Sequence, residues 1–139
     1  ASIYLTTSIV TSIVGSTWTK VAGTTTSDLL LDCTAGTSNQ ITYTATPTTV
    51  FNCTARISYI CQTNDKSLEF GFYVNSTLQS NYITKVRYDT TSIVNNDVCT
   101  VNALLSLAQN DTLEVWCQNT SGGADIDVNE MSVIIVAID

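Results

Sequence analysis

The stretch that decides the fold is Phe51-Asn52-Cys53-Thr54-Ala55-Arg56-Ile57-Ser58-Tyr59-Ile60-Cys61. Its odd-numbered positions are all apolar, whereas its even-numbered positions are mostly polar. Side chains alternate between the two faces of a strand, so this pattern places one face on a core and the other toward solvent. The stretch therefore predicts a long, half-buried β-strand.

Segments on the C-terminal side of this stretch repeat the period of two. Apolar residues alternate over three of them: 68–74, 99–107 and 113–117. The best helical candidate, Ala103–Ala108, is short and lies within a strand pattern. Turn residues at Gln62–Asp65 and Gln109–Asp111 separate long strands, as hairpin loops do. Strands joined by turns predict an all-β, antiparallel sandwich or barrel. The length allows eight to ten such strands, which suggests a jelly-roll sandwich.

The final apolar run, Met131–Ile138, differs from the others because Val133–Val136 is apolar on both faces. A strand of this kind is covered on both sides. We therefore expect it to be central in its sheet or covered by a neighbouring subunit.

Length and composition describe one globular domain over residues 1–139. Hydrophobic residues make up 44% of the chain and charged residues only 12%, with 24 Thr and 14 Ser supplying much of the polarity. A disordered chain would have low hydrophobicity and high charge. No apolar run approaches the ~20 residues that span a bilayer, so we expect no membrane insertion.

The net charge of −7 excludes a common class of partner. Nucleic-acid binders neutralise phosphates with a basic stripe, whereas the five cations of this chain are scattered along it. We therefore expect no nucleic acid as a partner, and the same argument disfavours anionic membrane surfaces.

Catalysis has little support in the sequence. The chain has no histidine, which excludes Ser-His-Asp and Cys-His arrangements. Glu69 and Glu114 lie on outward strand faces, but an all-β domain with 12 acidic residues produces such pairs by chance. We expect no enzyme and no cofactor.

Four motifs in order carry a resemblance to a known family. They are Trp18–Thr26, Gln40–Thr44 followed by the Val50–Cys61 strand, Leu107–Val115 with Asn119-Thr120 after it, and Met131–Val136. This succession resembles the jelly-roll domains of the tumour-necrosis-factor (TNF) and complement type. It is more similar to their versions in phage and other viral structural proteins, on head fibres, spikes and tail tips. The resemblance covers essentially the whole chain.

The resemblance implies a homotrimer in which one sheet face of each subunit is buried at a three-fold axis. It also implies a structural protein on the virion surface, acting as a spike, head fibre or capsid decoration with a host-attachment role. A host-surface glycan or protein receptor and other virion proteins would be its partners. The alternative is a secreted, extracellular carbohydrate-binding or adhesin β-sandwich module. The chain would be a whole protein or the head of a longer fibre or spike.

Two aromatic residues are candidates for a functional surface. Trp116 and Tyr73 lie on the outward parity of their strands. Aromatic side chains combine an apolar face with a polar atom and often anchor interfaces. The pair would line a subunit contact, pack within the domain or bind a ligand such as a sugar.

The five cysteines predict buried free thiols. Their number is odd, and four of them have core-facing parity: Cys53, Cys61, Cys99 and Cys117. The resemblance implies that the strand with Cys117 runs antiparallel beside the strand with Cys53, so Cys53–Cys117 is the candidate disulfide. Without histidine or a Cys-x-x-Cys motif, no metal site is expected at the cysteines.

Asp125 and Asp127, with Glu130, form the densest acidic cluster. Calcium prefers carboxylate oxygens. The alternating sequence Asp-Ile-Asp-Val is nevertheless typical of a strand whose carboxylates point to solvent. A solvated edge is therefore the main expectation, and a bound cation is the alternative.

Overall fold

The structure is a computed structural model that describes residues 1–89 and 96–138. Its ten strands of four or more residues are β1 (Ser2–Ser8), β4 (Gly23–Ser27), β5 (Cys33–Gly36), β6 (Gln40–Tyr43), β7 (Thr49–Cys61), β8 (Lys66–Val74), β10 (Thr84–Tyr88), β11 (Asp97–Leu107), β12 (Thr112–Asn119) and β13 (Ile126–Ala137). The described residues also form three two-residue strands, β2 (Val10–Thr11), β3 (Thr19–Lys20) and β9 (Thr77–Leu78), and a 3₁₀ helix, Ser80–Tyr82. The predicted all-β fold of eight to ten strands is confirmed. The helical candidate at Ala103–Ala108 is instead the end of β11, which stops at Leu107, followed by the first residue of the next loop.

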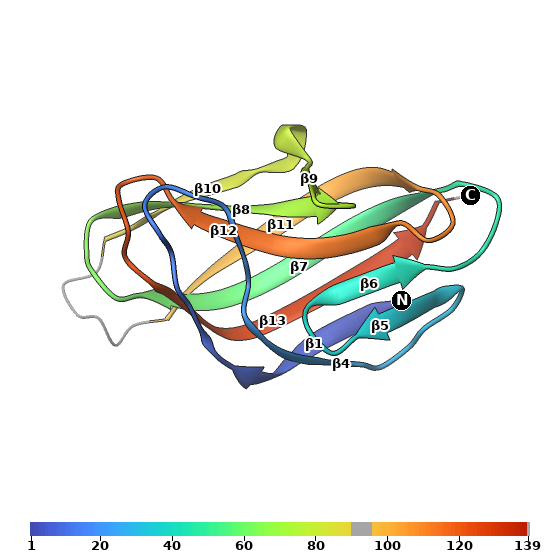
Figure 1. The fold of residues 1–139 in the computed structure, drawn as a ribbon, viewed down its shortest axis with the longest axis horizontal. Coiled ribbons are helices and arrows are strands. Elements are labelled where there is room, and N and C mark those ends of the chain that lie inside the picture. Colours follow the sequence, from blue (N-terminus) through green and yellow to red (C-terminus); the bar gives the residue numbers. More distant parts are fainter. Residues whose placement is uncertain (90–95, 139) are drawn as a thin grey trace.

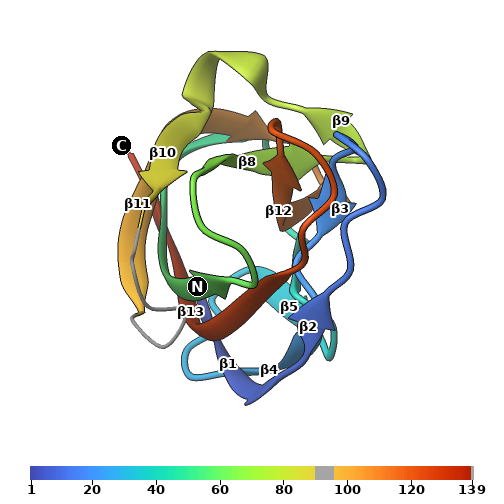
Figure 2. The ribbon, with the colours of Figure 1, turned by 90° about the vertical axis from the view of Figure 1, so that its left-hand side faces the viewer.

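The strands form two antiparallel sheets packed face to face (Figure 1). Sheet A has the order β11-β7-β13-β1-β4, with β2 added beside β13. Sheet B has the order β10-β8-β12-β6-β5, with β3 beside β12 and β9 beside β8. Seen end-on in Figure 2, the two sheets curve around a common interior, as expected for twisted antiparallel layers.

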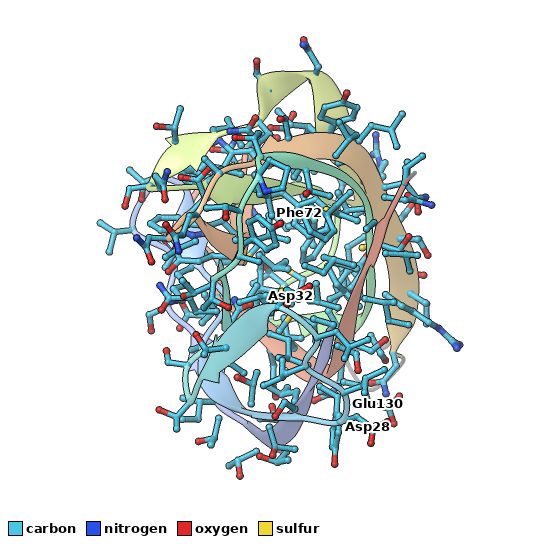
Figure 3. The ribbon with its side chains drawn as sticks, turned by 90° about the vertical axis from the view of Figure 1, so that its right-hand side faces the viewer. Asp28, Asp32, Phe72 and Glu130 are labelled. Carbon is cyan, nitrogen blue, oxygen red and sulfur yellow. The ribbon has the colours of Figure 1, made fainter. Side chains whose placement is uncertain are left out.

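The core lies between the sheets and follows the alternation of the sequence. The odd-numbered residues of β7 from Cys53 to Cys61 have no exposed surface. Sheet B contributes the inward residues of β8 and β12, among them Phe72, which lies in the interior in Figure 3. The long strands thus turn one face to the core and the other outward, and parts of β8 and β12 are also buried on their outward side.

The two loops predicted as hairpins have a different role. Gln62–Asp65 joins β7 in sheet A to β8 in sheet B, and Gln109–Asp111 joins β11 in sheet A to β12 in sheet B. Asp65 and Asn110 have positive φ values of 57° and 72°, a conformation that short polar residues tolerate. The hairpin prediction was wrong because strands that face each other across a core show the same alternation as strands paired side by side.

β13 is central in sheet A, between β7 and β1, as its apolar sequence predicted. The register with β7 shifts between Val128 and Glu130, which is a β-bulge. Because of this extra residue, Val128 and Met131 both point into the core while Glu130 is exposed. The bulge therefore decides which β13 side chains reach the outer face of sheet A.

Candidate functional site

The outer face of sheet B holds an aromatic cluster that contains both predicted residues. The rings of Tyr73 and Trp116 stack with centroids 4.2 Å apart, and Trp18 meets Tyr73 edge-on at 5.9 Å. Gly71 makes room for Trp18, because a Cβ at Gly71 would lie 3.3 Å from the indole ring. With Trp116 stacked on it and Trp18 packed against its ring, Tyr73 is only 9% exposed. The structure thus brings Tyr73 and Trp116 together, and the chain itself covers much of the pair.

Glu114 is the polar centre beside this cluster. Its carboxylate accepts hydrogen bonds from Lys20 Nζ at 2.6 Å, Trp116 Nε1 at 2.9 Å and Gln40 Nε2 at 3.0 Å. Burial alone would raise the pKa of Glu114, but these three donors and the charge of Lys20 outweigh it and lower the pKa. Glu114 therefore fixes the indole of Trp116 and connects β12 to β3 and β6.

This lowered pKa predicts an acid-sensitive contribution to stability. The free energy of unfolding should contain a Glu114 contribution that is present above the ordinary pKa of 4.5 and is lost as pH falls through the folded-state value. Urea unfolding should therefore give a higher free energy of unfolding for the wild type than for Glu114→Gln at about pH 7, and the difference should become smaller toward about pH 3. When both proteins also carry Lys20→Met, the difference at about pH 7 should be smaller, because the ion pair is gone. A difference independent of pH would contradict the prediction.

Glu69 and Glu114 do not form a catalytic pair of carboxylates. Glu69 lies opposite Gln118 and Glu114 opposite Tyr73, so four strand residues, about 13 Å, separate them. Glu69 has its own partners, Gln118 Nε2 at 2.6 Å and Lys85 Nζ at 2.9 Å. The pair lies beyond the separation that glycoside hydrolysis uses.

The outer face of sheet A is apolar toward the C-terminal end of β13. Val136 and Leu104 flank Asn52 in one row of the sheet, and they are 58% and 54% exposed. We call these two and their exposed neighbours the apolar face: Val50, Leu104, Ile134, Val136 and Ile138. The sequence pointed to this face only through the last strand, because isolated Val50 and Leu104 carry no signal until the register aligns them.

The cysteines are free and buried, and the predicted disulfide is absent. Cys53 is on β7 in sheet A, whereas Cys117 is on β12, which pairs with β8, β6 and β3 in sheet B. The strand adjacency that suggested Cys53–Cys117 is therefore wrong. Burial raises the pKa of both thiols to about 12, and that of Cys99 likewise. All three remain protonated and behave as small apolar residues.

The acidic cluster is tied to the N-terminal segment. Asp125 accepts hydrogen bonds from the Ile13 backbone at 2.9 Å and from Ser12 Oγ at 3.4 Å, and Asp127 accepts one from Ser8 Oγ at 2.7 Å. These carboxylates therefore hold residues 8–13 along the edge of sheet A and are more than a solvated edge. Within residues 1–89 and 96–138, no three acidic or cysteine side chains are grouped to hold a metal ion. No helix in this part of the chain has the length and hydropathy to cross a membrane.

Comparison with known proteins identifies the fold. No protein-family model and no curated protein sequence matches the chain. The structure is similar to the crystal structure of murine APRIL at pH 5.0, with a TM-score of 0.59 and 10% identity over 91% of this chain and 96% of that one. It is also similar to the structure of Eiger TNF from S. frugiperda, with a TM-score of 0.57 and 14% identity over 96% and 94% of the two chains. The chain therefore has a TNF-like jelly-roll fold.

Proposed function

We propose that this chain is the trimeric attachment domain of a particle-surface protein, a viral or phage spike, head fibre or capsid decoration that adheres to a host surface. Its partners are two further copies of itself, other virion proteins and a host receptor. Its role is binding, with no catalytic step. Residues 1–139 act as one unit, whether whole or at the end of a longer fibre.

The observation that carries the proposal is the apolar face of sheet A. Soluble monomers seldom expose several large aliphatic side chains together, and such patches mark interaction sites. The TNF-like resemblance implies that a sheet face is buried at a three-fold axis, and closed symmetric homo-oligomers are the common case. The hydroxyl-rich, weakly charged remainder of the surface suits adhesion, because hydroxyls bond sugars and few charges limit salt effects.

A second candidate is the secreted carbohydrate-binding or adhesin module. The aromatic cluster of Trp18, Tyr73 and Trp116 favours it, because aromatic rings stack on sugars and the half-buried rings of Trp18 and Trp116 keep part of their surface accessible. This candidate predicts a monomer that binds glycans through Trp116, whereas the proposal predicts an obligate assembly.

Mass in solution separates the two. Light scattering coupled to size exclusion should give three times the chain mass of 15.0 kDa, and the value should hold at nanomolar protein. A persistent 15.0 kDa species would contradict the trimer and favour the carbohydrate-binding module.

A further inference from the structure

Lys20 and Gln40 lie end to end along one side of β12, on the outer face of sheet B. Lys20 is on β3, which runs beside β12 in Figure 2, and it lies opposite Trp116. The antiparallel register of β6 with β12 brings Gln40 beside Glu114. Two positions of β12, about 7 Å, therefore separate Lys20 from Gln40. The residue that follows each of them is buried, so both side chains point outward, on the opposite side of the sandwich from the apolar face.

One carboxylate oxygen joins these two side chains. Oε1 of Glu114 accepts a hydrogen bond from Lys20 Nζ at 2.6 Å and another from Gln40 Nε2 at 3.0 Å. Trp116 Nε1 donates to the other oxygen, Oε2, at 2.9 Å, and this contact fixes the carboxylate. The side chains of Lys20 and Glu114 are 27% and 11% exposed. An amine, a primary amide and a carboxylate are thus held together where water has limited access.

We propose that Lys20 and Gln40 form an intramolecular isopeptide bond, with Glu114 as the acid–base group. The unprotonated Nζ of Lys20 attacks Cδ of Gln40, and a new Nζ–Cδ bond forms. Glu114 accepts a proton from Nζ and gives it to Nε2, the Cδ–Nε2 bond breaks, and Nε2 leaves as ammonia. The proton that Lys20 first loses to solvent is taken up by this ammonia. One amide replaces another, so the reaction needs no oxidant and no second substrate.

The arrangement supplies what the reaction of an amine with an amide lacks in solution. Reactants held in place behave as if their concentration were about 10⁵–10⁸ M, and a positioned acid–base group adds about 10²–10⁴ in rate. The lowered pKa of Glu114 keeps its carboxylate ionised and able to accept a proton. An ammonium group is not a nucleophile, so the ion pair of Lys20 and Glu114 is the state before the reaction. The bond should therefore form slowly at neutral pH and faster at alkaline pH.

A second group of the same three residue types on sheet B has a different geometry. Glu69 binds Lys85 through Oε1 at 2.9 Å and Gln118 through Oε2 at 2.6 Å. Lys85 and Gln118 lie opposite Glu69 on the two sides of β8, so two strand spacings, about 10 Å, separate them. The side chain of Lys85 is also 75% exposed. Glu69 thus stands between the amine and the amide, and we expect no bond there.

The isopeptide bond would close a loop over residues 20–40, which contains β4 and β5. Within the described residues β3 and β6 each pair with β12 and not with each other. A covalent link between them restricts the unfolded chain, as a disulfide does, and so stabilises the folded one. This inference goes beyond the proposed function and is independent of it. The site lies on sheet B, so a trimer that buries the apolar face of sheet A leaves it unchanged.

The test is the intact mass of the full chain, measured after purification and during incubation at about pH 9, where a larger share of lysine is unprotonated. The chain should lose the mass of one ammonia molecule. Trypsin should then release residues 1–56 as one peptide, because a linked Lys20 is no longer a cleavage site. Fragmentation of this peptide should give no backbone fragments from within 20–40, since the bond closes that segment into a ring.

Matched variants identify the two bonded residues. Lys20→Arg keeps the positive charge and Gln40→Met keeps the side-chain length, and each should abolish the loss of ammonia. Lys85→Arg and Gln118→Met make the same changes in the second group and should leave the loss unchanged. Glu114→Gln should slow the loss at least about tenfold, because the acid–base group is gone.

Other results would overturn the inference and leave the trimer standing. They are an unchanged mass after prolonged incubation at about pH 9, a loss of ammonia that persists in Lys20→Arg or Gln40→Met, and a rate that Glu114→Gln does not alter. A loss that requires Lys85 would also overturn it. Light scattering decides the proposed function separately: a linked chain with a mass of 15.0 kDa in solution would support the bond and contradict the trimer.

Discussion

Val136→Lys should convert the proposed trimer into monomers of 15.0 kDa. Val136 is 58% exposed at the centre of the apolar face, so a lysine there costs the isolated chain little, within about 1 kcal/mol. In a trimer that covers this face, each copy would bury an ammonium group without a partner. Such a charge costs about 3–5 kcal/mol, and every 1.4 kcal/mol is a tenfold change in association. The dissociation constant of the trimer should therefore rise by a factor of about 10² or more for each copy that carries the lysine.

Val14→Lys is the matched control. It makes the same substitution at a residue that is 78% exposed and lies outside both sheets. Light scattering over a dilution series should show a trimer for Val14→Lys and a monomer for Val136→Lys. Circular dichroism should show the same strand signal for both, which excludes unfolding as the cause. If Val136→Lys stays trimeric, the interface is elsewhere, and the half-buried Trp116 on sheet B becomes the next residue to test.

The sequence predicted the core more successfully than the surfaces. Burial of alternate residues on β7 follows directly from the alternation in 51–61, because one strand period fixes which side chains face the core. The two-sided apolar pattern of β13 predicted a strand that is central or covered by a neighbouring subunit, and the strand is central, with Ile134 and Val136 exposed on its outer face. These predictions succeeded because they depend on residues adjacent in sequence.

Features that depend on distant segments could not be predicted. The Cys53–Cys117 pairing failed because alternation does not reveal which sheet a strand joins. The contact of Trp18 with Tyr73 needs a segment 55 residues away in the sequence and the space left by Gly71. Glu130 lies on the outer face of sheet A only because of the bulge in β13, and no residue near it in the sequence predicts that bulge. Candidate surfaces therefore emerge only from register and topology.

The buried Asn39 is the strongest such case. It lies in the turn between β5 and β6, with no exposed surface, 18 residues from Val21 and 76 from Val115. β12 pairs with β6 at Thr112 and Leu113 and with β3 from Trp116 onward, so neither of those strands pairs with Val115. Asn39 fills this gap: its Nδ2 donates to the carbonyls of Val115 at 2.7 Å and Val21 at 3.2 Å, and its Oδ1 accepts from the Val115 amide at 3.3 Å.

Asn39→Ala should therefore lower the free energy of unfolding by about 2–5 kcal/mol, because the Val21 carbonyl and the Val115 amide lose their partner at about 1–3 kcal/mol each, while the Val115 carbonyl keeps its hydrogen bond from the Val21 amide at 3.1 Å. Asn75 provides the matched control. Its φ of 49° is close to the 47° of Asn39, and its side chain bonds Asp111 and Thr112, but it is exposed. Asn75→Ala pays the same backbone strain while water replaces its partners, so it should cost about 1 kcal/mol.

Urea unfolding should be measured for both variants at protein concentrations where they have the same oligomeric state. The difference between their losses in free energy of unfolding then gives the contribution of the buried Asn39 hydrogen bonds. Asn39→Gly separates backbone from side chain: glycine accepts the positive φ without strain, so only the lost hydrogen bonds remain. It should recover about 1 kcal/mol relative to Asn39→Ala and stay well below the wild type. Equal losses for Asn39→Ala and Asn75→Ala would mean that the positive φ, and not the side-chain bridge to Val21 and Val115, gives Asn39 its effect on stability.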